Sequence, residues 1–346
     1  MRYFNGYCIT LRPVAVMAYM HLPAKKNWFG KTWLKYTNKE KYHEYKALLQ
    51  YYEQYNNAYS SIARFVSEKK DLTVNEIFEN AAGSFEINLV HSGNAGDVVY
   101  SLPVAQKLSE MTFKPVNFLL KLNEPLDLLP GDTHPLKNVM LNEQMAANLI
   151  PLLKSQPYLN NVEVYTDQPI HLNLSLFREA GLELDKGNIA RWNFYTTGIN
   201  TDLSKPWLKA NPNKEFSDSI VIARSSRYNN PLIDYSFLSE YRNVVFVGIK
   251  QEYDRMKKHI PSLIWYTVNS FLDLAEVISG SKLFIGNQSF PFSVAEGLKV
   301  VRLLEVYHRI PNVIPEGQNG YDFCFQKHFE YLVDSLVSSE RRFVYE

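Results

Sequence analysis

The chain has 346 residues, of which 46% are hydrophobic and 21% charged, and a formal net charge of +1 at pH 7. The length predicts two domains of ordinary size, and the balanced charge excludes a global attraction to nucleic acid or membranes. Two cysteines far apart in the sequence, Cys8 and Cys324, exclude a cysteine-based zinc site and argue against a disulfide-stapled secreted protein, so a reducing cytoplasm fits best.

Residues 1–84 form an N-terminal extension that we expect to be mostly helical. Its apolar stretch, residues 14–20, is too short for a spanning helix and is not typical of a signal peptide. A long helix or helix pair is predicted over residues 39–69, because aromatic and aliphatic residues recur there at helical spacing without a proline. Thr73 and Glu76 stand at the spacing of a capping box, which predicts a second helix start.

Residues 25–46 combine basic and aromatic side chains. Seven lysines stand there against two glutamates, with Trp28, Phe29 and Trp33 interleaved. Such a segment can contact a peripheral membrane surface or an unstacked nucleic-acid strand. It can equally be a solvated basic helix that packs its aromatic side chains inward.

The stretch from residue 85 to residue 110 organises the rest of the chain. An apolar strand over residues 87–90 is followed by a glycine turn, Ser92–Gly96, and then by a helix in which apolar residues recur at helical spacing. Asp97 therefore lies at or near a helix N-terminus, where its carboxylate can cap the helix or face a ligand above the carboxyl end of the strand. His91 and Asn94 flank the same turn on the expected acceptor side.

The alternation of strands and helices predicts an α/β protein with two doubly wound parallel sheets. A strand over residues 116–120 follows the first helix, a helix and a short strand follow by residue 165, and a polar segment over 168–210 could line an inter-domain cleft. The turn-rich stretch 211–218 is the best boundary between domains, since a second strand-helix alternation begins directly after it. We therefore predict domains at 85–210 and 211–346.

Two loops of the second domain have the character of an anion site. The first contains Arg224, Ser225, Ser226 and Arg227 just past the carboxyl end of a strand, where ligands of open α/β sheets bind, although a solvated surface loop is an equal interpretation. The second follows the strand at 283–285 and contains Gln288, Ser289, Pro291 and Ser293, a pattern that suits a helix start with backbone amides for a phosphate.

The run Gly96-Asp97-Val98-Val99-Tyr100-Ser101-Leu102-Pro103-Val104-Ala105 resembles the N-terminal signature of glycosyltransferase family 9, the ADP-heptose:lipopolysaccharide heptosyltransferases. The resemblance implies a GT-B-like fold, two Rossmann-like domains facing a cleft, and makes Asp97 the general base. The segment Ser225-Ser226-Arg227 is similar to a family segment after its first C-domain strand, and Gly248 with Glu252 looks like its nucleoside-binding pair.

The chain departs from the family pattern at two places. The catalytic-site lysine of the family falls at Asn230, and the aspartate, glycine and histidine of its phosphate loop are absent from the region of Gln288, Ser289 and Ser293. ADP-heptose is therefore not implied as the donor, and another nucleotide sugar suits the sequence as well.

The expected function is inverting, metal-independent transfer of a sugar from a nucleotide-diphosphate sugar to a hydroxyl of a glycan, glycolipid or other acceptor. No metal site and no cofactor beyond the co-substrate is predicted, and the expected location is the cytoplasm or the inner face of the membrane. Two alternatives remain open: a nucleotide-sugar 2-epimerase-like enzyme and a non-catalytic GT-B-like binding module. A methyltransferase is disfavoured because the strand at 116–120 offers no acidic ribose ligand.

Overall fold

The computed structural model describes residues 25–126 and 139–338. The described chain divides into two compact units, one ending at Arg64 and the other beginning at Phe65. The stretch 14–20 and Cys8 lie outside the described residues. No helix within the described ranges is both long and apolar enough to cross a membrane.

The described part of the N-terminal unit, residues 25–64, is mostly helical. It comprises α1 (Trp28–Thr37) and most of α2 (Lys39–Ser67). Asn27 begins α1 by accepting a hydrogen bond from the Gly30 amide at 2.8 Å, the usual role of asparagine at an N-cap. The predicted capping box is also present at α3 (Val74–Ala81), which belongs to the second unit: Thr73 and Glu76 exchange hydrogen bonds of 2.7 and 3.3 Å.

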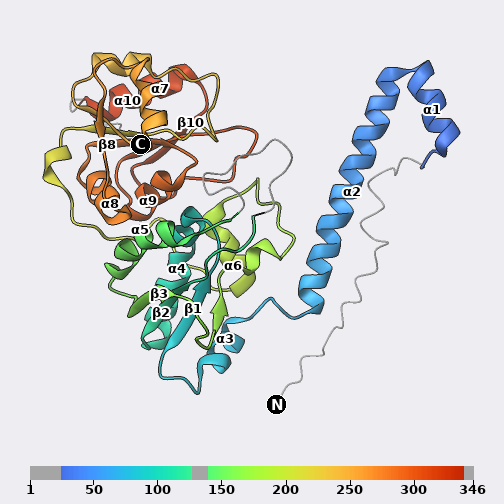
Figure 1. The fold of residues 1–346 in the computed structure, drawn as a ribbon, viewed down its shortest axis with the longest axis horizontal. Helices are drawn as coiled ribbons and strands as arrows, with labels where there is room; N and C mark the ends of the chain where they lie inside the picture. The colour runs from blue at the N-terminus through green and yellow to red at the C-terminus, as the bar shows by residue number, and fades with distance from the viewer. Residues whose placement is uncertain (1–24, 127–138, 339–346) are drawn as a thin grey trace, which may run out of the picture. The chain divides into compact units, whose positions relative to one another are not determined.

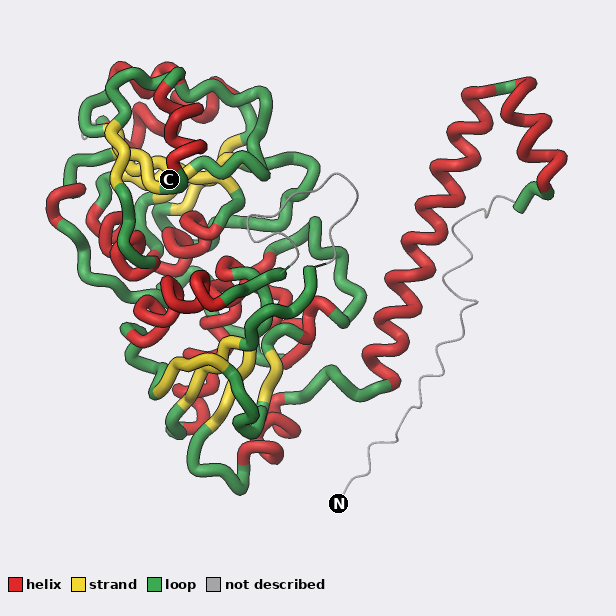
Figure 2. The backbone as a smooth tube through the Cα atoms, in the orientation of Figure 1, coloured by secondary structure: helices red, strands yellow, loops and turns green. Residues whose placement is uncertain are grey.

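The second unit contains two separate parallel sheets, so the predicted α/β class with two Rossmann-like halves is confirmed (Figures 1 and 2). The front half has strand order β3-β2-β1-β4 and the rear half β10-β9-β8-β5-β6-β7. The front half contains β1 (Ile87–His91), α4 (Ala95–Thr112), β2 (Val116–Leu120), α5 (Glu143–Lys154), β3 (Asn161–Val164), β4 (Leu172–Asn173) and α6 (Trp192–Thr197).

The rear half continues the alternation to the C-terminal end of the described chain. Its elements are β5 (Ile220–Ala223), β6 (Val244–Val247), α7 (Lys250–Lys257), β7 (Ile264–Tyr266), α8 (Phe271–Gly280), β8 (Leu283–Asn287), α9 (Phe290–Leu298), β9 (Arg302–Glu305), β10 (Gly320–Phe323) and α10 (Gln326–Val337). Residues 236–240 form a 3-10 helix. Asp234 accepts hydrogen bonds from the amide and hydroxyl of Ser236, and this local bonding competes with a regular helix.

The central strands of both sheets are buried on both faces, which explains the nearly continuous apolar sequences of β1, β2, β5, β6 and β8. In β5, Val221 and Ala223 enter one hydrophobic cluster while Ile220 and Ile222 enter a second. The first cluster runs across both halves, because α8 and α9 of the rear half pack against α5 and α4 of the front half (Figure 1). The two halves therefore share this first hydrophobic cluster.

The connection between the halves is fixed to both of them. On the front side the Lys209 amide donates to Gln156 at 2.8 Å, and Tyr158 donates to the Trp207 carbonyl at 2.6 Å. On the rear side the Trp207 and Leu208 amides both donate to the Gly297 carbonyl at 3.0 Å. Further along, the backbone of residue 213 passes so close to Gly280 that a Cβ there would overlap it.

Candidate functional site

Each sheet has one place where the strand order reverses. In the front sheet the chain builds β1, β2 and β3 to one side and then adds β4 on the other side of β1. In the rear sheet β5, β6 and β7 run one way, and β8, β9 and β10 run the other way from β5. Ligands of open α/β sheets bind outside the carboxyl ends of the strands at such a reversal. The candidate site therefore lies at the loops after β1, β4, β5 and β8.

The structure brings the loop after β1 against the loop after β8. A Cβ added to Gly96 would lie 3.9 Å from Ser293 Oγ and 4.0 Å from the Cα of Phe290, which are ordinary contact distances. Gly96 stands in the first turn of α4, and Phe290 begins α9. The two reversal points thus meet, and Asp97 follows directly after the contact residue Gly96.

Asp97 is largely buried, with 7% of its surface exposed, and its carboxylate is held through one oxygen. Oδ2 accepts a hydrogen bond from the Asn94 amide at 3.2 Å and pairs with Arg178, which follows β4 in a 3-10 helix, Leu176–Arg178. Oδ1 has no hydrogen-bond partner among the described residues. The same carboxylate can therefore cap α4 and still accept a proton at Oδ1.

His91 ends β1 and is fully buried beneath the turn. Its Nδ1 accepts a hydrogen bond from the Gly93 amide at 2.9 Å, so in the neutral ring the proton lies on Nε2, which has no partner. Burial, with a smaller contribution from the Arg178 charge, lowers the pKa of His91 from 6.5 to about 4 against the opposing effect of Asp97. His91 is therefore neutral near pH 7.

Three buried polar atoms in this cluster have no hydrogen-bond partner among the described residues: His91 Nε2, Asn94 Oδ1 and Arg178 Nε. Buried polar atoms are normally satisfied, because an unmade hydrogen bond leaves the full cost of desolvation. Three such atoms around one turn indicate a place that a polar ligand or water completes. They are three of the six such side-chain atoms within the described chain.

Gly93 is required by crowding at the centre of this cluster. A Cβ there would lie 2.7 Å from His91 Cε1 and 3.0 Å from Asp97 Oδ2. We expect Gly93→Ala to lower the free energy of unfolding by about 1–3 kcal/mol, because a buried ring and a paired carboxylate must move. Gly83→Ala is the matched control, since a Cβ at Gly83 meets nothing within 4 Å. Equal urea midpoints for both variants would contradict the crowding.

Because the pKa of His91 is lowered in the folded protein, the free energy of unfolding should depend on pH. In the unfolded chain His91 binds a proton from about pH 6.5 downward, whereas in the folded chain it binds one only near pH 4, so stability falls as the pH falls through this window. The expected loss from His91 is about 2 kcal/mol between roughly pH 7.5 and pH 5. His91→Asn, which can keep an acceptor for the Gly93 amide, should remove this part of the slope in urea titrations. An unchanged slope would contradict the assignment.

On the rear side, Asn287 joins the two loops at the reversal point. Its Oδ1 accepts from the Ser225 amide at 3.0 Å and its Nδ2 donates to the Ser225 carbonyl at 2.8 Å. The Ser226 amide donates to Glu252 at 3.0 Å, and a Cβ added to Gly248 would lie 3.4 Å from the Glu252 carboxylate. Burial raises the pKa of the Glu252 carboxyl. The structure thus gathers Ser225, Ser226, Gly248 and Glu252 into one corner of the rear half.

Several residues predicted to bind the donor instead make hydrogen bonds to other parts of the chain. Arg224 makes a two-pronged pair with the buried Glu305 at 2.7 and 2.8 Å, so its guanidinium is committed to the interior. Gln288 donates to the Ile310 carbonyl at 2.5 Å and accepts from the Tyr307 amide at 2.7 Å. Ser293 is fully buried and donates to the Phe290 carbonyl at 2.7 Å. These three side chains position the loops, and we assign them no direct ligand contact.

Several predicted residues stay accessible, among them Ser226, Arg227 and Ser289. Arg227 is exposed and its guanidinium lies 4.6 Å from the centre of the Tyr228 ring. Ser289 is the N-cap residue of α9 and is half-buried, with its hydroxyl 3.3 Å from the Asn287 carbonyl. Within the described ranges no group of three or more histidine, cysteine, aspartate or glutamate side chains could hold a metal ion.

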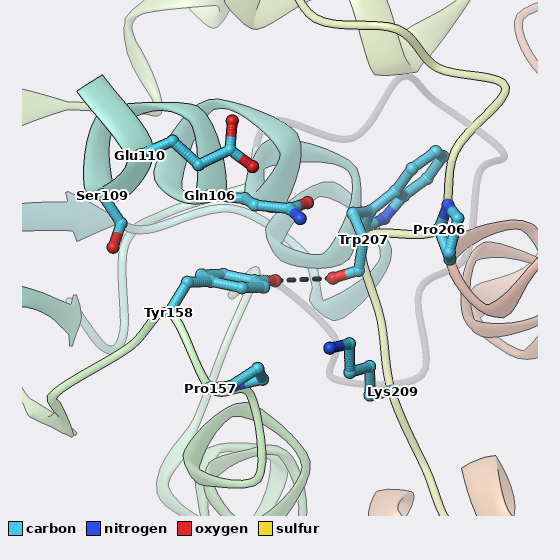
Figure 3. A pocket seen from close by; sticks show the side chains of 8 residues that line it. All are labelled: Gln106, Ser109, Glu110, Pro157, Tyr158, Pro206, Trp207 and Lys209. Carbon is cyan, nitrogen blue, oxygen red and sulfur yellow. Dashed lines mark hydrogen bonds between the residues drawn. The ribbon is translucent and has the colours of Figure 1, made fainter.

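A surface pocket lies away from this junction. Figure 3 shows it between the C-terminal half of α4 and the inter-half connection, where Gln106, Glu110, Tyr158 and Lys209 line it. The Tyr158 hydroxyl donates to the Trp207 carbonyl within it (Figure 3). Gln106 stands nine positions beyond Asp97 in α4, which corresponds to about 13 Å along the helix. This pocket is therefore not the candidate site.

Among solved structures, the chain is similar to a glycosyl transferase family 9 protein from Veillonella parvula, with 11% identity, a TM-score of 0.46, and coverage of 75% of this chain and 90% of that one. It is also similar to the ADP-heptose lps heptosyltransferase II of E. coli, with 12% identity, a TM-score of 0.48, and coverage of 73% and 99%. For E. coli heptosyltransferase WaaC the identity is 11%, the TM-score 0.40, and the coverage 69% and 92%.

The sequence matches no protein-family model and no curated protein. At these identities and TM-scores we base no functional conclusion on the likenesses.

Sequence reasoning missed Ser175 and Arg178, which come to the turn from the loop after β4. The Ser175 hydroxyl accepts from the Ser92 amide at 2.7 Å, and Arg178 pairs with Asp97. The strand before them, β4, has only two residues, Leu172–Asn173, and so leaves no alternating pattern to find. The usable signal is Arg178 itself, a cation that directly follows the mostly apolar run Leu174–Phe177.

Proposed function

We propose that the protein is a glycosyltransferase that moves a sugar from a nucleotide-diphosphate sugar to an acceptor hydroxyl. The observation that carries this proposal is the contact of Gly96 with Phe290 and Ser293, which sets the reversal points of two doubly wound sheets against each other. One reversal point can hold a nucleotide while the other presents an acceptor, as a two-substrate transfer requires. The resemblance of residues 96–105 to the family 9 signature supports the same assignment.

In the proposed reaction Asp97 acts as the general base. Its Oδ1 takes the proton of the acceptor hydroxyl, and the resulting oxygen attacks the anomeric carbon from the face opposite the diphosphate. The carbon–oxygen bond to the diphosphate breaks, and the leaving oxygen keeps the electron pair. Arg178 holds the carboxylate through Oδ2, so it is a positioning residue in this scheme.

The leaving diphosphate is stabilised by the rear half without a metal ion in this proposal. Arg227 is the exposed cation of the loop after β5, and Ser226 and Ser289 offer hydroxyls on either side of the reversal point. A charge developing on the diphosphate would also be favoured by the N-terminus of α9. Glu252, a carboxylate in the same corner, suits a hydroxyl of the nucleoside ribose.

The experiment is a thermal-shift screen with ADP, UDP, GDP, CDP and dTDP, followed by incubation of the matching nucleotide sugar with and without an acceptor. We expect one nucleotide to raise the melting temperature, and Arg227→Gln to reduce that shift. Release of the nucleotide only when an acceptor is present supports transfer. An isomerised sugar without an acceptor would indicate an epimerase, and stabilisation by none of the five would favour a binding module.

A further inference from the structure

The first helix, α1, presents an aromatic surface that the fold leaves uncovered. Trp28, Phe29, Trp33 and Tyr36 are 70%, 75%, 69% and 80% exposed. The interpretation in which the aromatic residues of this segment pack inward is therefore wrong for these four. Large apolar side chains gathered on one exposed face mark an interaction surface.

The four side chains share one side of the helix. At 100° per residue they span an arc of about 140°, from Trp28 through Tyr36 and Phe29 to Trp33. Leu34 and Gly30 lie on the other side and are half-buried. The Lys26 amide, just before α1, donates to the Tyr45 hydroxyl of α2 at 2.8 Å. The helix is thus fixed to its own unit, and its aromatic face remains open.

The charge around this face has one sign. Residues 25–46 contain seven lysines and two glutamates, and no acidic residue precedes Glu40. Lys31 and Lys35 are exposed, and they lie within about 60° of Trp28 around α1. No ion pair joins a lysine of this segment to an acid within the described chain. The segment is therefore complementary to a dense negative surface.

We infer that α1 and the start of α2 bind the surface of an anionic lipid bilayer. Tryptophan, phenylalanine and tyrosine on one helical face suit the boundary between headgroups and acyl chains, while lysines beside them meet the lipid phosphates. A single-stranded nucleic acid fits less well, because the segment has no arginine, the residue best suited to phosphate and base recognition. This inference does not depend on the proposed sugar transfer.

The test is flotation of the full chain with phosphatidylcholine vesicles that contain or lack phosphatidylglycerol. We expect binding only to the anionic vesicles and its release by high salt. Trp28→Ala with Trp33→Ala, and separately Lys31→Glu with Lys35→Glu, should each lower the bound fraction about tenfold or more. Of the other three tryptophans Trp192 and Trp207 are buried and Trp265 is half-buried outside this segment, so a blue shift of tryptophan emission on binding should be lost in the Trp28/Trp33 variant.

Matched controls carry the same changes elsewhere. Phe85→Ala with Tyr195→Ala removes exposed aromatics outside α1, and Lys154→Glu with Lys258→Glu reverses two exposed lysines. Both should bind vesicles like the unchanged chain, and circular dichroism should show every variant folded. The inference is overturned if the chain ignores anionic vesicles, if the controls lose binding equally, or if an oligothymidine strand binds while vesicles do not.

Discussion

Asp97→Asn is expected to reduce sugar transfer about 10²–10⁴-fold while the protein stays folded. The asparagine side chain is nearly isosteric with the carboxylate, and its oxygen can still accept a hydrogen bond from the Asn94 backbone N–H. It cannot take a proton from an acceptor hydroxyl. The loss of the pair with Arg178 should lower the free energy of unfolding by about 1–3 kcal/mol. Transfer is measured as nucleotide release with saturating acceptor, beside a urea titration of each variant.

Asp273→Asn is the matched control for this change. Asp273 stands in the first turn of α8 and accepts a hydrogen bond from the Asn269 amide at 2.8 Å, so like Asp97 it binds a backbone amide at the start of its helix. If Asp97 has only a structural role, both variants should keep their turnover, although Asp97→Asn also loses the pair with Arg178 and should lose more stability. A selective loss of turnover in Asp97→Asn identifies the base, and full turnover in both would remove Asp97 from the mechanism.

Glu305→Gln is expected to lower the free energy of unfolding by about 3–5 kcal/mol, the largest effect on stability that we predict. Glu305 is fully buried and accepts from Arg224 at 2.7 and 2.8 Å, from the Asn230 amide at 2.6 Å and from the Tyr235 hydroxyl at 2.9 Å. The neutral amide leaves the buried Arg224 charge without a counter-ion, which costs more than the pair itself contributes.

Two further variants test the cause of that loss. Glu240→Gln alters an exposed glutamate of the same half and should change the urea midpoint little. Adding Arg224→Met to Glu305→Gln should recover part of the lost stability, because the uncompensated charge is then gone. A double variant that is as unstable as the sum of the single changes would show that the charge is not the cause.

The fold was predictable where the sequence carries long local patterns. The apolar strands of both sheets and the helices between them follow from alternation, because buried parallel strands read as short apolar runs. The two-residue β4 was beyond reach, since its pairing with β1 depends on a contact more than eighty residues away in the chain. The stretch 236–240 forms a 3-10 helix because serine and aspartate side chains bond locally there.

The candidate site was only partly predictable for a related reason. The turn at Gly93 and the helix start at Asp97 are local features, so the sequence locates them. A charged loop such as Arg224–Arg227, by contrast, looks the same whether its partner is a ligand or a distant acid of the same chain. Arg224 meets Glu305 and Asp97 meets Arg178, and only the three-dimensional fold reveals either pair.

The doubly anchored connection between the halves bears on how substrates enter. Enzymes built from two halves often admit ligands by a hinge motion of one half about the segment that joins it to the other. Here that segment is hydrogen-bonded to Gln156 and Tyr158 of the front half and to Gly297 of the rear half. A wide swing would break buried hydrogen bonds on at least one side. We therefore expect substrates to reach the candidate site through rearrangement of the loops at the strand ends. The two halves should move little against each other.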